Sequence, residues 1–268
     1  MIRVEEVDFR YQAASHDVIS GLNIDLHRGE VLAVLGANGS GKSTLALLLN
    51  GLLHPTSGQI EVDGILTTEA GNASHIRSLV GIVLQSPDDQ IVATVVEEDV
   101  AFGPENLGID PGEIRARVDA ALEAVGLTGL ERREPHLLSG GQKQRLAIAG
   151  ILALQPAFLV LDEPTSMLDP SGRRDVLGII EKLRTLNHGI VHITHHVEDI
   201  ATSDRVLVLD KGAAVFCGTP EEFLQQERFL ESWGVAVPPI GVLAGRLRDL
   251  GVPVPATAMT AERIVGAL

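Results

Sequence analysis

The feature that most constrains the fold of this chain is one glycine-rich run, Gly36-Ala37-Asn38-Gly39-Ser40-Gly41-Lys42-Ser43-Thr44. It follows an apolar stretch at 31–35, which predicts a buried strand, and it leads into residues 45–50, which predict a helix that ends at Gly51. A strand, a glycine-rich loop and a helix in this order are the context in which such a run binds phosphate groups. The run therefore predicts an α/β fold that holds a nucleotide by its phosphates.

The residue types in this loop suit phosphate binding. Glycines allow successive backbone N–H groups to point into one concavity that binds oxyanions, and the following helix directs its positive end to the same place. Lys42 supplies a mobile charge for the β- and γ-phosphates, and the Ser43 hydroxyl can ligate Mg²⁺. An ordinary glycine-rich turn is the alternative, but the strand, the helix and the Lys-Ser pair all stand in register.

The charge balance and the cysteine content limit the class of protein. There are 36 acidic and 21 basic residues, for a net charge of −15, whereas nucleic-acid binders usually carry a basic footprint. Cys217 is the single cysteine, which excludes an intrachain disulfide and suits a reducing compartment. The first residues show no signal-peptide core, and no apolar run reaches membrane-spanning length. We therefore expect that another chain holds this one at any membrane where it acts.

The region before the loop is predicted to form strands. An alternating apolar pattern changes parity at Glu5-Glu6, which predicts a strand with a bulge, and a second alternating pattern covers 22–26. After the loop helix, Asp63-Gly64 predicts a hairpin turn. Tyr11 ends the first strand, where its ring can stack on a nucleotide base or serve as a half-buried packing residue.

A helical subdomain is predicted at about 86–150, after a buried strand at 80–84. The stretches 95–102 and 111–125 have helical patterns. The second carries one apolar stripe, made of Ile114, Val118, Ala121, Leu122 and Val125. The remaining apolar strands are expected at 158–161, 190–194, 205–209 and 213–216.

A second glycine-rich helix start is the run Leu138-Ser139-Gly140-Gly141-Gln142, in which Ser139 can cap the helix. Because backbone N–H groups at a helix start bind anions, this run is a second potential anion site. A simple capped helix with a flexible lead-in explains the same residues when they are taken alone.

Two acidic residues, Asp162 and Glu163, follow the strand at 158–161 at its carboxyl end, where α/β sheets place their ligand sites. One carboxylate can hold Mg²⁺, and the next can position and deprotonate an attacking water. An acidic cap on the following helix is the alternative. The strand at 190–194 ends at His195-His196, where a histidine facing the γ-phosphate is a better interpretation than a metal site, because zinc-type spacing is absent.

Together these motifs resemble the ATP-binding-cassette (ABC) ATPases over about residues 1–230, with Leu138–Gln142 as the family hallmark. The resemblance implies an α/β P-loop NTPase core with an antiparallel β subdomain, a helical insertion and a small C-terminal extension. It implies that ATP and Mg²⁺ are bound and that two ATPase chains sandwich two ATP molecules. In that arrangement Ser139–Gln142 contacts the nucleotide bound by the opposite chain, and Ser166–Asp169 crosses the dimer interface.

The resemblance also assigns roles to matching residues. Glu163 is the general base, His195 is the switch residue that contacts the γ-phosphate, and Lys42 completes the catalytic set. The implied metal ligands are Ser43, Gln85 and Asp162. The implied nucleotide contacts are Tyr11 on the adenine, Gly36, Ala37, Asn38, Gly39, Ser40, Gly41, Lys42, Ser43, Thr44 and Gln85, and from the opposite chain Ser139, Gly140, Gly141 and Gln142.

A narrower resemblance, carried by Gln85–Gln90 and Glu98–Asn106, is to the energy-coupling-factor ATPases and their cobalt-transport relatives. Those systems join one or two ATPase subunits to a transmembrane coupling protein and a substrate-capture membrane protein, and they import vitamins or transition-metal ions. The resemblance therefore implies an importer ATPase at the cytoplasmic face of the cell membrane, with no nucleic-acid partner. It assigns 1–233 to the ATPase domain and 234–268 to an extension that helps to pair the ATPases.

The extension is expected to hold an apolar helix at 240–250 and a last helix after Thr260. Leu243, Leu247 and Leu250 would form an apolar face that packs on its own domain or on another chain. The choice between a homodimer and a heterodimer stays open. Pro164 resembles one ATPase type of heterodimeric systems and Ser166–Asp169 the other, and His196 stands where an acidic residue is common.

Three other functions compete with that of an importer ATPase. A cassette protein that acts on DNA or ribosomes is disfavoured by the net charge of −15 and by the missing coiled-coil insertion. A stand-alone phosphotransferase would not explain the presence of the run Leu138–Gln142. A degenerate regulatory module is disfavoured because Lys42, Asp162, Glu163 and His195 are all intact.

Overall fold

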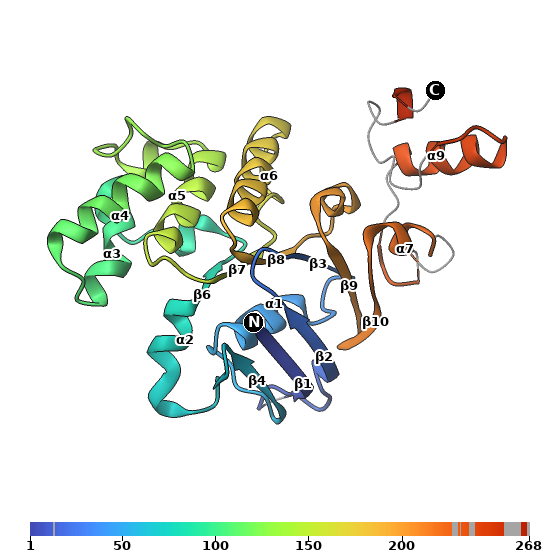
Figure 1. The fold of residues 1–268 in the computed structure, drawn as a ribbon, viewed down its shortest axis with the longest axis horizontal. Coiled ribbons are helices and arrows are strands. Elements are labelled where there is room, and N and C mark those ends of the chain that lie inside the picture. The colour runs from blue at the N-terminus through green and yellow to red at the C-terminus, as the bar shows by residue number, and fades with distance from the viewer. Residues whose placement is uncertain (13, 227–229, 231, 236–238, 255–263, 267–268) are drawn as a thin grey trace.

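The computed structural model describes residues 1–268 except 13, 227–229, 231, 236–238, 255–263 and 267–268. Its larger sheet consists of β3 (Val31–Leu35), β6 (Val80–Val83), β7 (Phe158–Asp162), β8 (Gly189–Ile193), β9 (Arg205–Asp210) and β10 (Ala213–Gly218). The strand order is β10-β9-β3-β8-β7-β6 (Figure 1). Neighbouring strands are parallel, apart from β10, which runs antiparallel to β9.

The parallel strands are covered on both faces, which explains their continuous apolar sequences. Every residue of β3, β6, β7 and β8 is buried. In Figure 1, α5 (Gly140–Leu152) and α6 (Pro170–Thr185) lie on one side of this sheet, and α1 (Lys42–Leu49) lies on the other. The α/β fold and its apolar strands are therefore confirmed.

A smaller antiparallel sheet has the order β2-β1-β4-β5, with β1 (Ile2–Phe9), β2 (Ile19–Leu26), β4 (Ser57–Val62) and β5 (Ile65–Leu66). The pairing of β1 with β2 shifts register between Val4 and Val7, and Glu6 has φ of +47°, so the predicted bulge is confirmed. Asp63 and Gly64 form the predicted hairpin turn, with φ of +49° and +81°.

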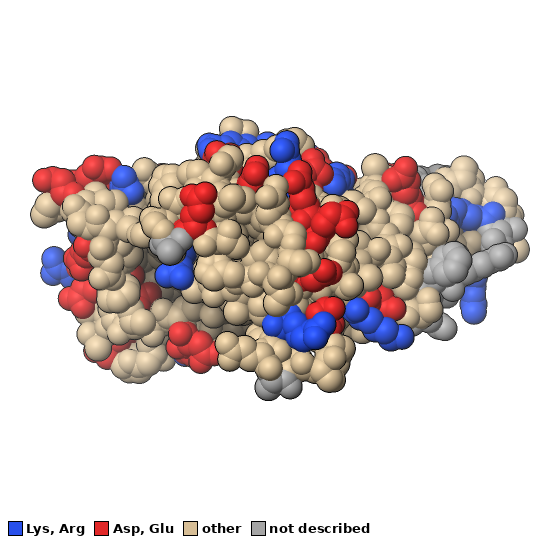
Figure 2. Space-filling view, turned by 90° about the horizontal axis from the view of Figure 1, so that it is seen from below, with Lys and Arg blue, Asp and Glu red and all other residues tan. Residues whose placement is uncertain are grey.

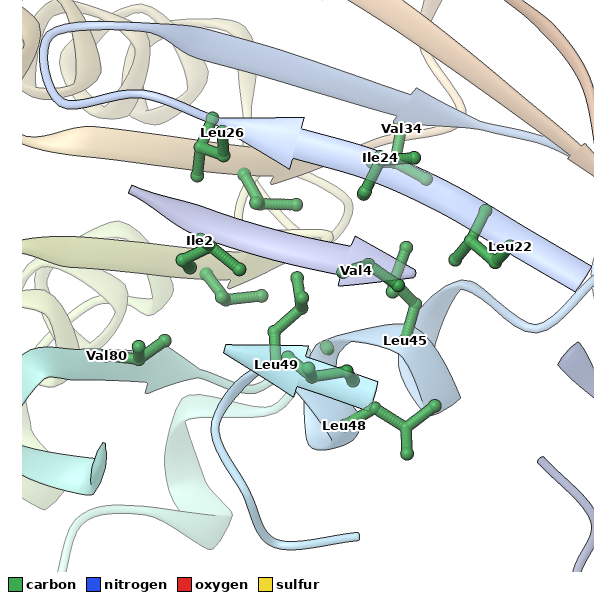
Figure 3. Packing of buried hydrophobic residues seen from close by; sticks show 14 of the residues in the cluster. Ile2, Val4, Leu22, Ile24, Leu26, Val34, Leu45, Leu48, Leu49 and Val80 are labelled. Carbon is green, nitrogen blue, oxygen red and sulfur yellow. The ribbon is translucent and has the colours of Figure 1, made fainter. Parts of the chain in front are cut away.

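The apolar core beneath α1 holds the phosphate loop in place. Leu45, Leu48 and Leu49 on α1 pack among buried residues of β1 and β2 such as Ile2 and Leu22 (Figure 3). Burying one leucine stabilises a fold by about 1.5–3 kcal/mol relative to leaving it exposed. The core therefore fixes the start of α1 and, with it, the loop that precedes this helix.

Three helices form a lobe at the β6 edge of the larger sheet (Figure 1): α3 (Val96–Asn106), α4 (Pro111–Ala124) and α5. The predicted stripe on α4 packs inside this lobe, where four of its residues are at most 4% exposed and Ile114 is half-buried. The shorter helices are α2 (Ala73–Leu79) and the 3₁₀ helices η1 (Ala70–Asn72), η2 (Pro87–Asp89), η3 (Pro135–Leu137) and η4 (Val197–Thr202).

Beyond β10 the chain forms α7 (Pro220–Leu224) and α9 (Pro239–Asp249). The three leucines of the predicted apolar face of the tail differ in burial. Leu247 packs against a small buried cluster within the tail, whereas Leu243 and Leu250 are 47% and 80% exposed. The start of the helix expected after Thr260 lies outside the described residues.

The surface carries both signs of charge. Figure 2 shows acidic and basic side chains interspersed over the described part of one face, without a continuous basic stripe there. Such a stripe is what neutralises the phosphates of a nucleic acid. Across the described residues, none of the helices combines the length and the apolar character that a membrane span needs.

Candidate functional site

The phosphate loop connects β3 to α1, as its sequence predicts. Gly36 has φ of +146°, and a Cβ there would lie 2.2 Å from a backbone oxygen of β9, so only glycine fits. Lys42 is 6% exposed, and its Nζ donates hydrogen bonds to the backbone oxygens of Gly36 and Ala37, both at 2.9 Å. Burial lowers the pKa of the Lys42 ammonium, and the nearby Glu163 and Asp162 carboxylates oppose this. The lysine therefore braces the loop through its Nζ.

A cavity of about 670 Å³ opens over this loop. Its walls combine the loop with Gln85, Glu163 and His195. These three residues follow the carboxyl ends of β6, β7 and β8, which are neighbours in the sheet, and α/β folds place their ligands at this edge. The complete lining is Val18, Gly36, Ala37, Asn38, Gly39, Gly41, Lys42, Ser43, Thr44, Gln85, Glu163, His195 and Gly234.

Glu163 makes the polar contacts that join the walls of the cavity. Its Oε2 accepts a hydrogen bond from Gln85 Nε2 at 3.1 Å and lies 3.4 Å from His195 Nδ1. Its backbone has φ of +49°, which is a strained conformation for a residue with a side chain. A carboxylate, an amide and an imidazole therefore meet in the cavity that also contains Lys42.

Asp162 is buried at the end of β7 and is not part of the cavity lining. Burial raises the pKa of its carboxyl, a hydrogen bond from Ser43 lowers it, and the charges of Glu163 and Lys42 have smaller, opposite effects. A hydroxyl and a carboxylate therefore lie together at the start of α1, and hard oxygen donors of this kind fit Mg²⁺. The described residues contain no group of three or more His, Cys, Asp or Glu side chains that could hold a metal. This donor set suits an ion that takes its other ligands from phosphate and water.

Two of the nucleotide contacts predicted within the chain's own site, Ser40 and Tyr11, lie outside the cavity lining. Ser40 is buried at 3% exposure. The Tyr11 hydroxyl lies 3.2 Å from Thr44 Oγ1, and its ring packs edge-on against Phe9, with 4.8 Å between the ring centroids. Because Tyr11 is 42% exposed, packing accounts for one part of the ring and leaves another part accessible to a base.

The second glycine-rich helix start is not brought to this cavity. Ser139 caps α5 in a capping box, in which its Oγ accepts from the Gln142 N–H at 3.3 Å and its own N–H donates to Gln142 Oε1 at 2.9 Å. Ser139 and Gly140 are exposed, and residues 139–142 do not line the cavity. Contact of this run with a nucleotide on another chain stays a prediction.

Gly234 is a lining residue that sequence reasoning missed. It has φ of +67°, and a Cβ at this position would lie 2.6 Å from the Cβ of Ala37. Gly234 therefore packs directly against Ala37 of the phosphate loop. A glycine outside any motif carries no signal of such a contact. Val18, directly before β2, is a second lining residue that was missed, and it too lies outside any motif.

Known proteins are similar to this chain in sequence and in fold. Residues 19–166 match the family model described as ABC transporter. The chain is 54% identical over 251 residues to the energy-coupling factor transporter ATP-binding protein EcfA1 of Symbiobacterium thermophilum, across 93% of this chain and 88% of that protein. It is 47% identical over 254 residues to the cobalt import ATP-binding protein CbiO of Syntrophus aciditrophicus, across 95% of this chain and 91% of that protein.

Solved structures of ABC proteins match the fold of this chain. The structure of cbiO1 from Clostridium perfringens, part of the ABC transporter complex cbiONQ, matches with a TM-score of 0.79 and 36% identity, across 91% of this chain and 98% of that one. A dimeric ATP-binding cassette in a post-hydrolysis state with ADP and Pi matches with a TM-score of 0.74 and 26% identity, across 82% and 99%. These likenesses confirm the resemblance carried by the motifs. The chain belongs to the ABC transporter family as an ATP-binding subunit of the energy-coupling factor type, an ATPase coupled to transport.

Proposed function

We propose that the chain hydrolyses ATP in the cavity over the phosphate loop, with Lys42, Glu163 and His195 as its catalytic residues. The observation that supports this most is the contact of Glu163 with Gln85 and His195, at 3.1 and 3.4 Å. The loop N–H groups and Lys42 bind the phosphates. Glu163 orients and deprotonates the attacking water, and His195 contacts the γ-phosphate.

Ser43, Gln85 and Asp162 are the proposed ligands of Mg²⁺. Bound Mg²⁺ would neutralise charge that develops on the phosphate oxygens. The hydrogen bond between Ser43 and Asp162 supports this set, because it holds two hard oxygen donors at the start of α1. Gln85 also donates to Glu163, so it would connect the metal site with the general base.

The hydrolytic site is completed, in this proposal, by a second ATPase chain. The run Ser139–Gln142 lies outside the cavity of its own chain, and its helix start offers N–H groups to an anion. When two chains close, Ser139 and Gly141 of one chain would stabilise the γ-phosphate bound by the other. The related cassette that holds ADP and Pi is a dimer. A homodimer and a heterodimer both satisfy this geometry.

The segment from Gln85 to Asn106 is the proposed docking site for a transmembrane coupling protein, which in turn would hold a substrate-capture membrane protein. Gln85 lines the nucleotide cavity, and Asp88 on η2 pairs with Lys143 on α5 at 2.6 Å. Movement of α5 would therefore be passed to this segment. A surface cavity of about 350 Å³ lies along it, lined by Asp88, Ile91, Ala93, Thr94, Glu134, Pro135 and His136.

The chain would then act at the cytoplasmic face of the cell membrane as part of an importer. The similarity to a cobalt import protein supports a transition-metal ion as cargo, and the family resemblance described above implies a vitamin as the alternative. The cargo site would lie on the membrane subunits. The domain limits at 1–233, with a helical subdomain at about 86–150, and the extension at 234–268 are part of the same proposal.

Purification of the tagged chain from membranes of its own cells should recover integral membrane proteins. Thr94→Arg should release them, because the long cation enters the 350 Å³ docking cavity, while ATP binding is kept. Thr128→Arg, at another exposed threonine of the helical lobe, is the matched control. Recovery of ribosomes or DNA alone would contradict an importer subunit. Equal recovery with both variants would contradict the docking site.

Truncation before Pro238 should weaken the pairing of ATPase chains and leave ATP binding intact. Leu243 and Leu250 are exposed, and burying one leucine is worth about 1.5–3 kcal/mol, so the dimer-dissociation constant should rise about tenfold or more. The truncated chain keeps Gly234 and the whole cavity lining. Sedimentation equilibrium measures pairing, and titration with a fluorescent nucleotide measures binding. An unchanged dimer-dissociation constant would show that the tail does not pair the chains.

A further inference from the structure

Asp199 is a buried carboxylate that lies outside the nucleotide cavity and belongs to none of the motifs. It stands in η4 and is 1% exposed. Its Oδ2 accepts hydrogen bonds from Thr165 Oγ1 at 3.2 Å and from Thr194 Oγ1 at 2.9 Å. Its Oδ1 accepts from Nε and Nη2 of Arg173 at 2.9 and 2.7 Å. These four hydrogen bonds satisfy a group that would otherwise be costly to bury.

The two threonines stand next to proposed catalytic residues. Thr165 lies in the loop that begins with Glu163, and Thr194 directly precedes His195. The Thr194 Oγ1 also accepts a hydrogen bond from the backbone N–H of His196 at 3.0 Å. One carboxylate oxygen of Asp199 therefore joins the loop after β7 to the loop after β8.

The loop after β7 needs such an anchor because it begins with a strained turn. Glu163 has φ of +49°, and a backbone in this region persists only where the surrounding structure holds it. Ser166 holds the turn locally, since both its N–H and its Oγ donate to the backbone oxygen of Glu163, at 3.2 and 3.0 Å. The bond from Thr165 to Asp199 ties the same turn to a different part of the chain.

The charge of Asp199 is balanced within this network. Burial is the largest single influence on the pKa of Arg173 and lowers it, but the hydrogen bonds and charges of Asp199 and Glu198 together raise this pKa overall, so Arg173 is a cation. Burial lowers the pKa of His192, a neighbouring residue of β8 that is completely buried. Arg173 on α6 is therefore the counter-charge, and it leaves Oδ2 of Asp199 to the two threonines.

We propose that Asp199 is a positioning residue for ATP hydrolysis. By holding Thr165 and Thr194 on one oxygen, it sets the position of Glu163 relative to His195, which meet at 3.4 Å. It lies outside the cavity lining and acts through those two residues. The inference rests on the proposed function, because it takes Glu163 as the base and His195 as the γ-phosphate contact.

The test removes each threonine hydroxyl without changing side-chain shape. In the full-length chain, assembled with its partner subunits, Thr165→Val and Thr194→Val should each lower kcat about 10- to 100-fold, which is the loss that a misplacement of about 1 Å can cause. The Kd for ATP should stay within about twofold, because the loop and Lys42 are unchanged. Thr165→Ser and Thr194→Ser restore the hydroxyl and should restore kcat.

Control variants and melting temperatures distinguish a misplaced Glu163 from a loss of folded protein. Thr185→Val removes an exposed hydroxyl that donates to the Lys182 backbone oxygen at 2.7 Å, and it should leave kcat unchanged. Melting temperatures are measured in parallel, and kcat is taken per folded molecule. In a Glu163→Gln background, Thr165→Val should add little further loss, because no base is left to position. A loss of the same factor in that background would overturn the proposal.

The proposal and its premise can fail separately. Unchanged turnover in Glu163→Gln would refute the assignment of the base, and with it the premise. A severe loss in Glu163→Gln, combined with wild-type kcat in both valine variants, would refute the role of Asp199 alone.

Discussion

Glu163→Gln is expected to lower kcat about 10²–10⁴-fold while ATP binding is retained, which is the range that general base catalysis contributes. Glutamine has the shape of glutamate and can keep contact with Gln85 and His195, but it cannot take a proton from water. Because hydrolysis would no longer open the pair of chains, the ATP-bound dimer should accumulate. Phosphate release measures turnover, and sedimentation velocity with ATP measures the dimer.

The control for this variant is Glu181→Gln. Glu181 is a residue of α6 whose side chain is 47% exposed and whose carboxylate lies 3.6 Å from Arg184, so the charge change is the same and the lost surface pair is worth little. It should show normal turnover and a normal monomer fraction. If Glu163→Gln behaved like this control, the assignment of the base would be wrong.

Lys42→Ala is expected to raise the Kd for ATP roughly 30-fold or more. Removing one partner of a buried, hydrogen-bonded charge pair costs about 2–5 kcal/mol, and each 1.4 kcal/mol is tenfold in Kd. The variant also loses the two bonds, both 2.9 Å long, with which Lys42 braces the backbone of Gly36 and Ala37. Isothermal titration with ATP measures the change.

Lys182→Ala is the matched control, because it removes one exposed lysine near the end of α6. The Nζ of Lys182 lies 3.5 Å from the backbone oxygen of Ala124. It should bind ATP like the unmodified chain. Equal affinities in the two variants would show that the loop binds phosphate without help from its lysine.

The parts of the fold with a local sequence signal were predictable. The stretches 31–35 and 158–161 are continuous apolar runs because helices cover both faces of the larger sheet. The change of parity at Glu5-Glu6 became a bulge, because alternation must keep apolar side chains on one face. Asp63 and Gly64 tolerate the positive φ that a two-residue hairpin turn demands.

The sequence predicts that Gln85, Glu163 and His195 lie at the same edge of the sheet. Each follows an apolar strand, and parallel strands place their carboxyl ends on one edge of the sheet. The strand order β8-β7-β6, which makes them neighbours, follows from packing and has no local signal. The roles of these residues came from the family resemblance and stay predictions until the variants are measured.

Long-range contacts that involve no motif could not be predicted from the sequence. Asp199 contacts Thr165 across 34 positions in the sequence, and neither residue type at that spacing signals a bond. In the tail, helical spacing grouped Leu243, Leu247 and Leu250 on one face. Among the described residues, Leu247 packs against the small tail cluster, whereas Leu243 and Leu250 are exposed.

The contact of Gly234 with Ala37 would couple ATP binding to the binding of any partner at the tail. Any partner that engages the tail and shifts Gly234 reshapes one wall of the nucleotide cavity, and thereby changes the free energy of ATP binding. Such linkage is reciprocal, so ATP must change the affinity for that partner by the same factor. A membrane complex that held the tail in this way would set the ATP concentration at which its own ATPase chains close.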